Sequence, residues 1–127
     1  MDRMIYVFLG GGLGSLARYL VGVQATRTFG FGWPFGTFIV NIVGGFVMGA
    51  LVGFLAHRGG ADQDKWRVLI GVGVLGGFTT FSSFSLEAAL MIERRQYAEA
   101  SVYAFSSVAL AITALFAGLM MSRRLFA

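Results

Sequence analysis

The sequence predicts an all-α membrane protein with four transmembrane helices. Of its 127 residues, 57% are hydrophobic and 13% are charged, whereas a soluble domain carries about 25% charged residues. A helix needs about 20 apolar residues to cross a hydrocarbon core of ~30 Å, so this chain is long enough for four crossings with short connections. We therefore expect residues 1–127 to form a single four-span domain surrounded by lipid.

Composition and charge exclude several classes of function. The sequence has no cysteine and one histidine, which removes disulfides, thiol catalysis and multi-histidine metal sites. The net charge of +4 comes from basic residues at the ends of apolar runs rather than on one solvated face, so no nucleic-acid partner is expected. No nucleophile, base and orienting group form a catalytic set, so the protein is not expected to be an enzyme.

The first two spans are predicted at residues 4–23 and 35–56. The first is kept as a mature helix because it is long, lacks a convincing small-residue cleavage site and precedes three more apolar stretches. The second begins after Pro34, and proline suits a helix start. It ends at 57–65, the only long polar stretch of the chain.

The third span is predicted at 66–92 with a break at 76–80, and the fourth at 97–121. The break is expected because two glycines are followed by phenylalanine and two adjacent threonines, which together make a poor helix. Backbone groups released from helical bonding at membrane depth need partners in protein, water or an ion. Free carbonyl groups there can hold a cation, as they do in the unwound segments of transporters.

Glycines recur at intervals of four residues within these spans. Gly45, Gly49 and Gly53 form one stripe, and the same interval separates the ends of 10–14 and 73–77. Residues four apart share a helix face, and small residues on that face let another helix approach closely in lipid. We expect tight helix packing, and a homo-oligomer because four short spans can hardly enclose a pathway alone.

Charge placement favours, by a small margin, termini in the cytoplasm. With four spans, six basic residues lie on the side of the termini and three lie on the opposite side. The positive-inside rule gives a weak preference on such a difference, and it leaves mixed insertion open. The two groups are Arg3, Arg58, Lys65, Arg67, Arg123 and Arg124, against Arg27, Arg94 and Arg95.

Polar side chains within the apolar segments are candidates for function because they are costly in a membrane. Thr37 and Asn41 share one face of the second span, and Tyr103 and Ser107 share one face of the fourth. The third span carries Glu87. Hydroxyl groups can instead bond to their own helix backbone, an alternative that stays open for Ser106 and Thr113.

Phe81 and Phe84 lie three residues apart and so share a helix face. An aromatic ring is positive at its edge, so two edges directed into a narrow passage can attract a small anion without a formal charge. The alternative is that the pair packs against lipid or core. Arg18, the charge inside the first span, either extends to the interface or lies in an aqueous vestibule where it concentrates anions.

Three stretches, 11–19, 41–49 and 76–85, closely resemble the Fluc (CrcB) fluoride channel family. The resemblance covers all four helices, and it implies a fluoride-selective passive channel that exports cytoplasmic fluoride across a bacterial inner membrane. It further implies a dual-topology homodimer whose two subunits insert antiparallel and form two pores.

The resemblance also implies roles for individual residues. A structural Na⁺ at the dimer centre would be held by backbone carbonyls that correspond to Gly76 and Thr79. The pore phenylalanines correspond to Phe81 and Phe84, and the pore-lining amide to Asn41. The polar track corresponds to Thr37, Ser82, Ser83, Glu87, Tyr103 and Ser107. The sequence departs from the family pattern at Ser83, where many relatives have threonine, and at Ala111, where a hydroxyl is expected.

Two other classes of function compete with the channel. A small proton-coupled multidrug exporter of the antiparallel-dimer type needs a carboxylate within the first span, and none occurs between Asp2 and Gln24. Only Glu87 can take that place. A structural subunit without a pathway is the other alternative, and it is favoured only if the polar faces satisfy one another.

Overall fold

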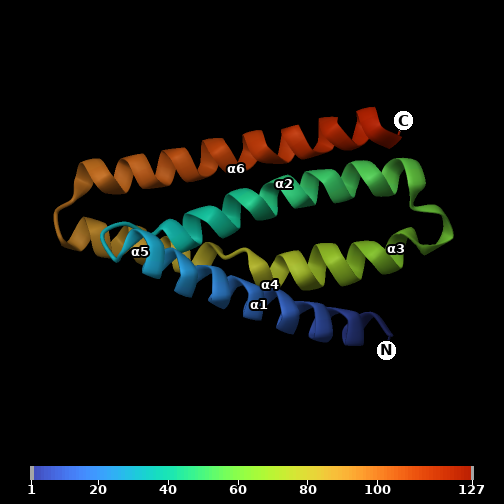
Figure 1. Ribbon diagram of the computed structural model, residues 1–127, viewed down its shortest axis with the longest axis horizontal. Helices are drawn as coiled ribbons and strands as arrows, with labels where there is room; N and C mark the ends of the chain where they lie inside the picture. Colours follow the sequence, from blue (N-terminus) through green and yellow to red (C-terminus); the bar gives the residue numbers. More distant parts are fainter. Residues whose placement is uncertain (1, 127) are drawn as a thin grey trace.

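The computed structural model describes residues 2–126, and they form a bundle of long helices (Figure 1). Four helical segments are long and apolar enough to cross a membrane: Asp2–Phe29, Phe35–Arg58, Gly60–Glu93 and Tyr97–Phe126. The connection that follows Arg58 lies at the same end of the bundle as both chain ends (Figure 1). The predicted fold class, an all-α protein with four membrane-length helices, is confirmed at this level.

The helices extend beyond the apolar stretches that predict them. Helix α1 (Asp2–Phe29) continues six residues past position 23. It is followed by Gly30, whose φ of 80° is left-handed and whose N–H donates to the Thr26 carbonyl at 2.8 Å. Glycine is the residue that most readily ends a helix in this way. Hydropathy marks only the lipid-buried part of a helix, so the extra turns escape it. Helices α2 (Phe35–Arg58) and α6 (Tyr97–Phe126) likewise continue past 56 and 121.

The third segment is made of several pieces. In chain order they are η1 (Gly60–Asp62), α3 (Gln63–Trp66), η2 (Arg67–Leu75), α4 (Gly76–Phe78) and α5 (Phe81–Glu93). Element η2 is a π-helix of nine residues, a rare geometry that the apolar pattern did not predict. Helix α1 packs along η2, where a Cβ atom at Gly73 would lie 2.9 Å from the Tyr6 carbonyl oxygen.

The interruption between α4 and α5 is shorter than the predicted break at 76–80. Only Thr79 (φ −87°, ψ 159°) and Thr80 (φ −153°, ψ 121°) are extended, while Gly76–Phe78 are helical. The glycines stay helical at the end of a continuous run whose last turn is closed by the Thr79 N–H, which donates to the Leu75 carbonyl at 3.0 Å. The two threonines leave the helix because β-branched residues favour extended backbone.

The glycine stripe of α2 lies in a close helix–helix contact, as the sequence predicts, and the structure shows that the partner is α6. Cβ atoms at Gly45, Gly49 and Gly53 would meet Ala111, the Leu115 carbonyl and Ser122, respectively, all on α6. Near the end of this contact, the buried Ser122 hydroxyl donates a hydrogen bond to the Ala50 carbonyl at 2.6 Å. Because the glycines let the two backbones touch, α2 and α6 form a rigid pair.

Gly49→Ala is expected to destabilise the fold by about 1–3 kcal/mol, the usual cost of overpacking. The added methyl group would collide with the Leu115 carbonyl and lie 2.9 Å from the Leu119 backbone nitrogen, neither of which can yield as a side chain does. Gly12→Ala is the matched control, since nothing lies within 4 Å of a Cβ atom there. Thermal unfolding in detergent measures both variants, and equal midpoints would contradict the close contact.

Candidate functional site

The interruption in the third segment is held by a side chain of α2. The Asn41 amide nitrogen donates to the Thr80 carbonyl at 3.1 Å, and the Asn41 amide oxygen accepts from the Thr80 N–H at 2.8 Å. These two bonds replace those that a continuous helix would give to Thr80. The sequence predicts Asn41 as a pore-lining amide with free donors, whereas one of its two N–H groups is committed to this clamp.

The same threonine starts the next helix. Thr80 is the N-cap of α5, and its hydroxyl accepts from the Ser83 N–H at 3.1 Å. An N-cap hydroxyl satisfies one of the donors that the first turn of a helix leaves free. The Ser82 hydroxyl lies 3.3 Å from the Thr80 hydroxyl. The Ser82 side chain is exposed and the Ser83 side chain is half-buried.

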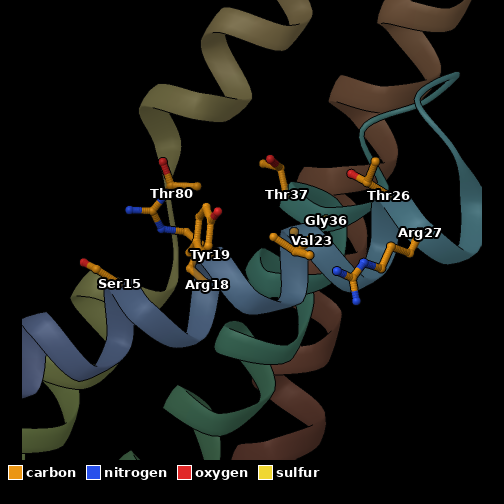
Figure 2. Close-up of a pocket in the computed structure, with 10 residues that line it drawn as sticks. Ser15, Arg18, Tyr19, Val23, Thr26, Arg27, Gly36, Thr37 and Thr80 are labelled. Carbon is orange, nitrogen blue, oxygen red and sulfur yellow. The ribbon is translucent and has the colours of Figure 1, made fainter.

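Arg18 reaches the interruption from α1. Its Nε donates to the Gly77 carbonyl at 3.0 Å, and its side chain lines a pocket of about 690 Å³ beside Thr80. Figure 2 shows Arg18 and Tyr19 lying next to Thr80, with Thr37 across the pocket on α2. We name this cavity the Arg18 pocket. The Arg18 side chain therefore lies within this pocket, next to the interruption.

A second cavity, which we name the inner pocket, brings together predicted residues from three helices. Its volume is about 240 Å³. It is lined by Asn41, Thr79, Thr80, Phe81, Phe84, Ser107, Val108 and Ala111. None of these side chains carries a charge. The pocket is open on one side of the chain, where the Phe81 side chain is 77% exposed.

The polar atom that stands out in the inner pocket is the Ser107 hydroxyl. It is buried and has no hydrogen-bond partner within residues 2–126. A buried hydroxyl without a partner costs free energy, so a ligand that accepts a hydrogen bond would gain by binding next to it. The neighbouring Phe81 and Phe84 rings have centroids 5.6 Å apart and planes tilted by 41°.

A third cavity, which we name the loop pocket, lies at the end of the bundle that carries the α1–α2 and α5–α6 connections. Its volume is about 250 Å³, and Thr37, Glu87 and Arg94 are among its lining residues. The fully buried Tyr103 donates its hydroxyl proton to the Glu87 carboxylate at 3.3 Å. The Phe84 ring packs against the Tyr103 ring, with centroids 5.1 Å apart and planes tilted by 45°, and so links the inner pocket to this group.

One backbone carbonyl within the interruption has no partner. Within residues 2–126, no hydrogen bond ends on the carbonyl oxygen of Thr79, while those of Gly77 and Thr80 accept from Arg18 and Asn41, respectively. The described residues contain no cluster of three acidic or histidine side chains. The Thr79 carbonyl is therefore an oxygen that is free to bind a cation at this place.

Some contacts of this site are not predictable from the sequence. The clamp joins residues 39 positions apart, a pairing that no local pattern encodes. The sequence also does not single out Trp33, although its ring packs edge-on against Tyr103 at 5.2 Å. Its position just before the second span is the one feature of the sequence that points to a role. The Ser106 and Thr113 hydroxyls bond to their own helix, donating to the Val102 and Ala109 carbonyls, respectively.

Four membrane-length helices, with their polar side chains gathered around an interruption in one of them, define a multi-pass membrane protein. The chain belongs to the CrcB family. The family model described as "CrcB-like protein, Camphor Resistance (CrcB)" matches residues 5–119. This confirms the family that the sequence motifs indicated.

Curated relatives match the chain over its full length. It is 63% identical over 127 residues, all of both chains, to the "Fluoride-specific ion channel FluC" of Phenylobacterium zucineum (strain HLK1). The protein of the same name from Caulobacter sp. (strain K31) is 63% identical over 126 residues, 99% of this chain and 98% of that one. Another from Hyphomonas neptunium (strain ATCC 15444) is 46% identical over 127 residues, again all of both chains.

Proposed function

We propose that this protein is a fluoride-selective ion channel that exports cytoplasmic fluoride by passive flow. One observation carries the proposal: an uncharged pocket holds the unpartnered Ser107 hydroxyl beside the rings of Phe81 and Phe84. The relatives are named as fluoride-specific ion channels, which supports the same function. All of those relatives are bacterial, so we infer that the protein resides in a bacterial inner membrane.

Selectivity would come from replacing the water around a small anion with close donors. Fluoride is strongly hydrated, so a passage that takes its water away must offer donors such as the Ser107 hydroxyl and the free N–H of Asn41. The positive edges of Phe81 and Phe84 add attraction without a charge. Since no cationic side chain lines the inner pocket, the anion is held weakly enough to leave, as conduction requires.

The three pockets suggest the route of the ion. Thr80 borders both the inner pocket and the Arg18 pocket, and Thr37 borders both the Arg18 pocket and the loop pocket. We assign Arg18 to a vestibule in which it raises the local anion concentration. The polar track that continues the route consists of Thr37, Ser82, Ser83, Glu87, Tyr103 and Ser107.

A second copy of the chain would complete the pathway. The exposed Phe81 ring and the open side of the inner pocket support this inference, because an anion in a single chain would meet lipid there. We propose a homodimer of antiparallel, dual-topology subunits with two pores. The interruption at Thr79 and Thr80 would then lie at mid-membrane, where the two copies cross.

A structural Na⁺ is proposed at the dimer centre, held by the Gly76 and Thr79 carbonyl oxygens. The Thr79 oxygen lacks a hydrogen bond in the described residues and lies in the extended segment, while Gly76 is three residues earlier at the start of α4. Carbonyls of unwound segments coordinate Na⁺ in transporters. When bound, the ion supplies positive potential where an anion crosses the low-dielectric centre. The chain's own part is to keep the Thr79 carbonyl free, because Asn41 and Arg18 occupy neighbouring ones.

The function is tested by fluoride efflux from proteoliposomes, followed with a fluoride electrode. We expect rapid efflux driven by the fluoride gradient alone and no comparable chloride efflux. Cation exchange driven by a pH gradient would instead support the proton-coupled exporter, and the absence of any flux would support a structural subunit. Either result would overturn the channel.

Arg94 is expected to influence how fluoride reaches the loop pocket. It lines that pocket together with Glu87, whereas the adjacent Arg95, turned by its φ of 63°, does not. Because the chain has no cysteine, Arg94→Cys can be labelled selectively with a cationic or an anionic thiol reagent. At low ionic strength we expect the anionic label to slow efflux by roughly threefold or more relative to the cationic one.

The matched control is Arg95→Cys, for which the two labels should give nearly equal efflux. The difference at position 94 should shrink as ionic strength rises, because salt screens exposed charges. Equal efflux with both labels at position 94 in low salt would show that Arg94 does not influence the fluoride route. The proposed channel function would still stand.

A further inference from the structure

The paired ends of α2 and α6 carry a group of basic side chains with no acidic neighbour on either helix. Arg58 ends α2, and Arg123 and Arg124 lie in the last turn of α6. All three are exposed. We name these three residues the terminal basic cluster. No Asp or Glu occurs within α2, and the sole acid of α6 is Glu99 at its opposite end.

The other half of the same bundle end is different, because two of its arginines are paired with a carboxylate. Asp64 forms ion pairs with Arg3 of α1 and with Arg67 at the start of η2. Within residues 2–126 these are the ion pairs that the structure contains, so the terminal basic cluster takes part in none. Asp62, the acid nearest to Arg58 in the chain, is exposed on the following turn.

The cluster is built on a rigid base. The Arg58 guanidinium lies over the Phe126 ring, 5.6 Å from its centroid, and Phe126 packs edge-on against Phe54 at 5.0 Å. One turn earlier, the buried Ser122 ties α6 to the Ala50 carbonyl of α2. A rigid base lowers the entropy lost when the guanidinium groups bind a ligand.

The three arginines also lie at a similar level along the long axis of the bundle. Arg123 and Arg124 are within three residues of Phe126, about 4.5 Å of helix rise, and Arg58 reaches that same ring. The surface next to them is apolar, with Leu125 64% exposed. Charge at a single level above an apolar belt matches the phosphates and acyl chains of one leaflet.

We propose that the terminal basic cluster is a binding site for the phosphate of an anionic phospholipid headgroup. Arginine suits this ligand because its planar fork donates two hydrogen bonds to phosphate oxygens. The acyl chains would lie along the exposed apolar faces of α2 and α6. The inference does not depend on the proposed channel activity.

The experiment measures which lipids stay with the purified protein. The full chain is reconstituted into nanodiscs with equal amounts of phosphatidylglycerol and phosphatidylcholine, re-extracted in mild detergent, and its retained lipids are counted by native mass spectrometry. We expect phosphatidylglycerol to be enriched several-fold. The triple variant Arg58→Gln/Arg123→Gln/Arg124→Gln should lose that enrichment, since it removes the guanidinium groups that would hold the phosphate.

The matched control removes the same number of charges at the opposite end, as Arg27→Gln/Arg94→Gln/Arg95→Gln. This control should keep the enrichment, and so should the triple arginine-to-lysine variant in part. Inorganic phosphate at millimolar concentration should not displace the lipid if the acyl chains contribute to binding; complete displacement would make the ligand free phosphate and overturn the lipid assignment. Equal retention by the two glutamine variants, or no enrichment in the native chain, would also overturn it.

Discussion

Phe81→Ile and Phe84→Ile are each expected to lower fluoride efflux from proteoliposomes by about 100-fold or more and to leave the proposed dimer intact. Isoleucine is also apolar but has no positive edge, so the anion would lose an attractive partner where its water has been removed. Removing a polar group from water without a compensating partner costs about 2–7 kcal/mol. An increase of ~3 kcal/mol in the barrier already slows the rate by a factor of about 100.

The fold should tolerate both changes. Phe81 is 77% exposed in the single chain and so adds little to its core. Phe84 contacts Phe81 and Tyr103 through ring stacking, and such a pair contributes roughly 0.5–1.5 kcal/mol beyond its buried area. Size-exclusion chromatography in detergent reports the oligomeric state, so lost flux can be separated from lost assembly.

Phe105→Ile is the control for this pair of variants. Phe105 lies on α6 with 78% of its side chain exposed, almost the same fraction as Phe81, and it lines none of the three pockets. Its replacement should leave efflux unchanged. Undiminished efflux in both Phe81→Ile and Phe84→Ile would refute the role of the ring edges, and an equal loss in Phe105→Ile would point to a general effect of removing phenyl groups.

The sequence predicts the four helices well because apolar length is a local property. The stripe at Gly45, Gly49 and Gly53 also predicts close packing, since spacing alone sets which residues share a face. The structure adds that this stripe packs against α6, and the choice of partner depends on tertiary contacts. The π-helical geometry of η2 was not predictable from apolar residues, whose pattern is compatible with an ordinary helix.

The candidate site is predicted by residue type more than by geometry. Thr37, Glu87 and Tyr103 do lie together, as do Phe81, Phe84 and Ser107. However, the sequence places the whole break at 76–80, while the structure confines it to Thr79 and Thr80. A lone amide on α2 gives no sign of its partner, so the sequence could not reveal that Asn41 holds the extended backbone.

Asn41→Ala is expected to lower the thermal stability of the protein and to reduce fluoride efflux by about tenfold or more. The substitution leaves the N–H and carbonyl of Thr80 without their partners at 2.8 and 3.1 Å, and each unsatisfied group costs about 1–3 kcal/mol. The extended segment would lose its position next to the inner pocket. Ser106→Ala is the control, because the Ser106 hydroxyl bonds only to its own helix.

Asn41→Asp separates the effect of losing the Thr80 clamp from the effect of placing a charge in the pathway. Its carboxylate can still accept from the Thr80 N–H, but it faces the Thr80 carbonyl with a second acceptor and places a negative charge in the inner pocket. We therefore expect a loss of stability similar to that of Asn41→Ala and a larger loss of efflux, since the anion is repelled as well. Native efflux in the aspartate variant would exclude Asn41 from the pore, whereas native stability in the alanine variant would show that the interruption needs no clamp.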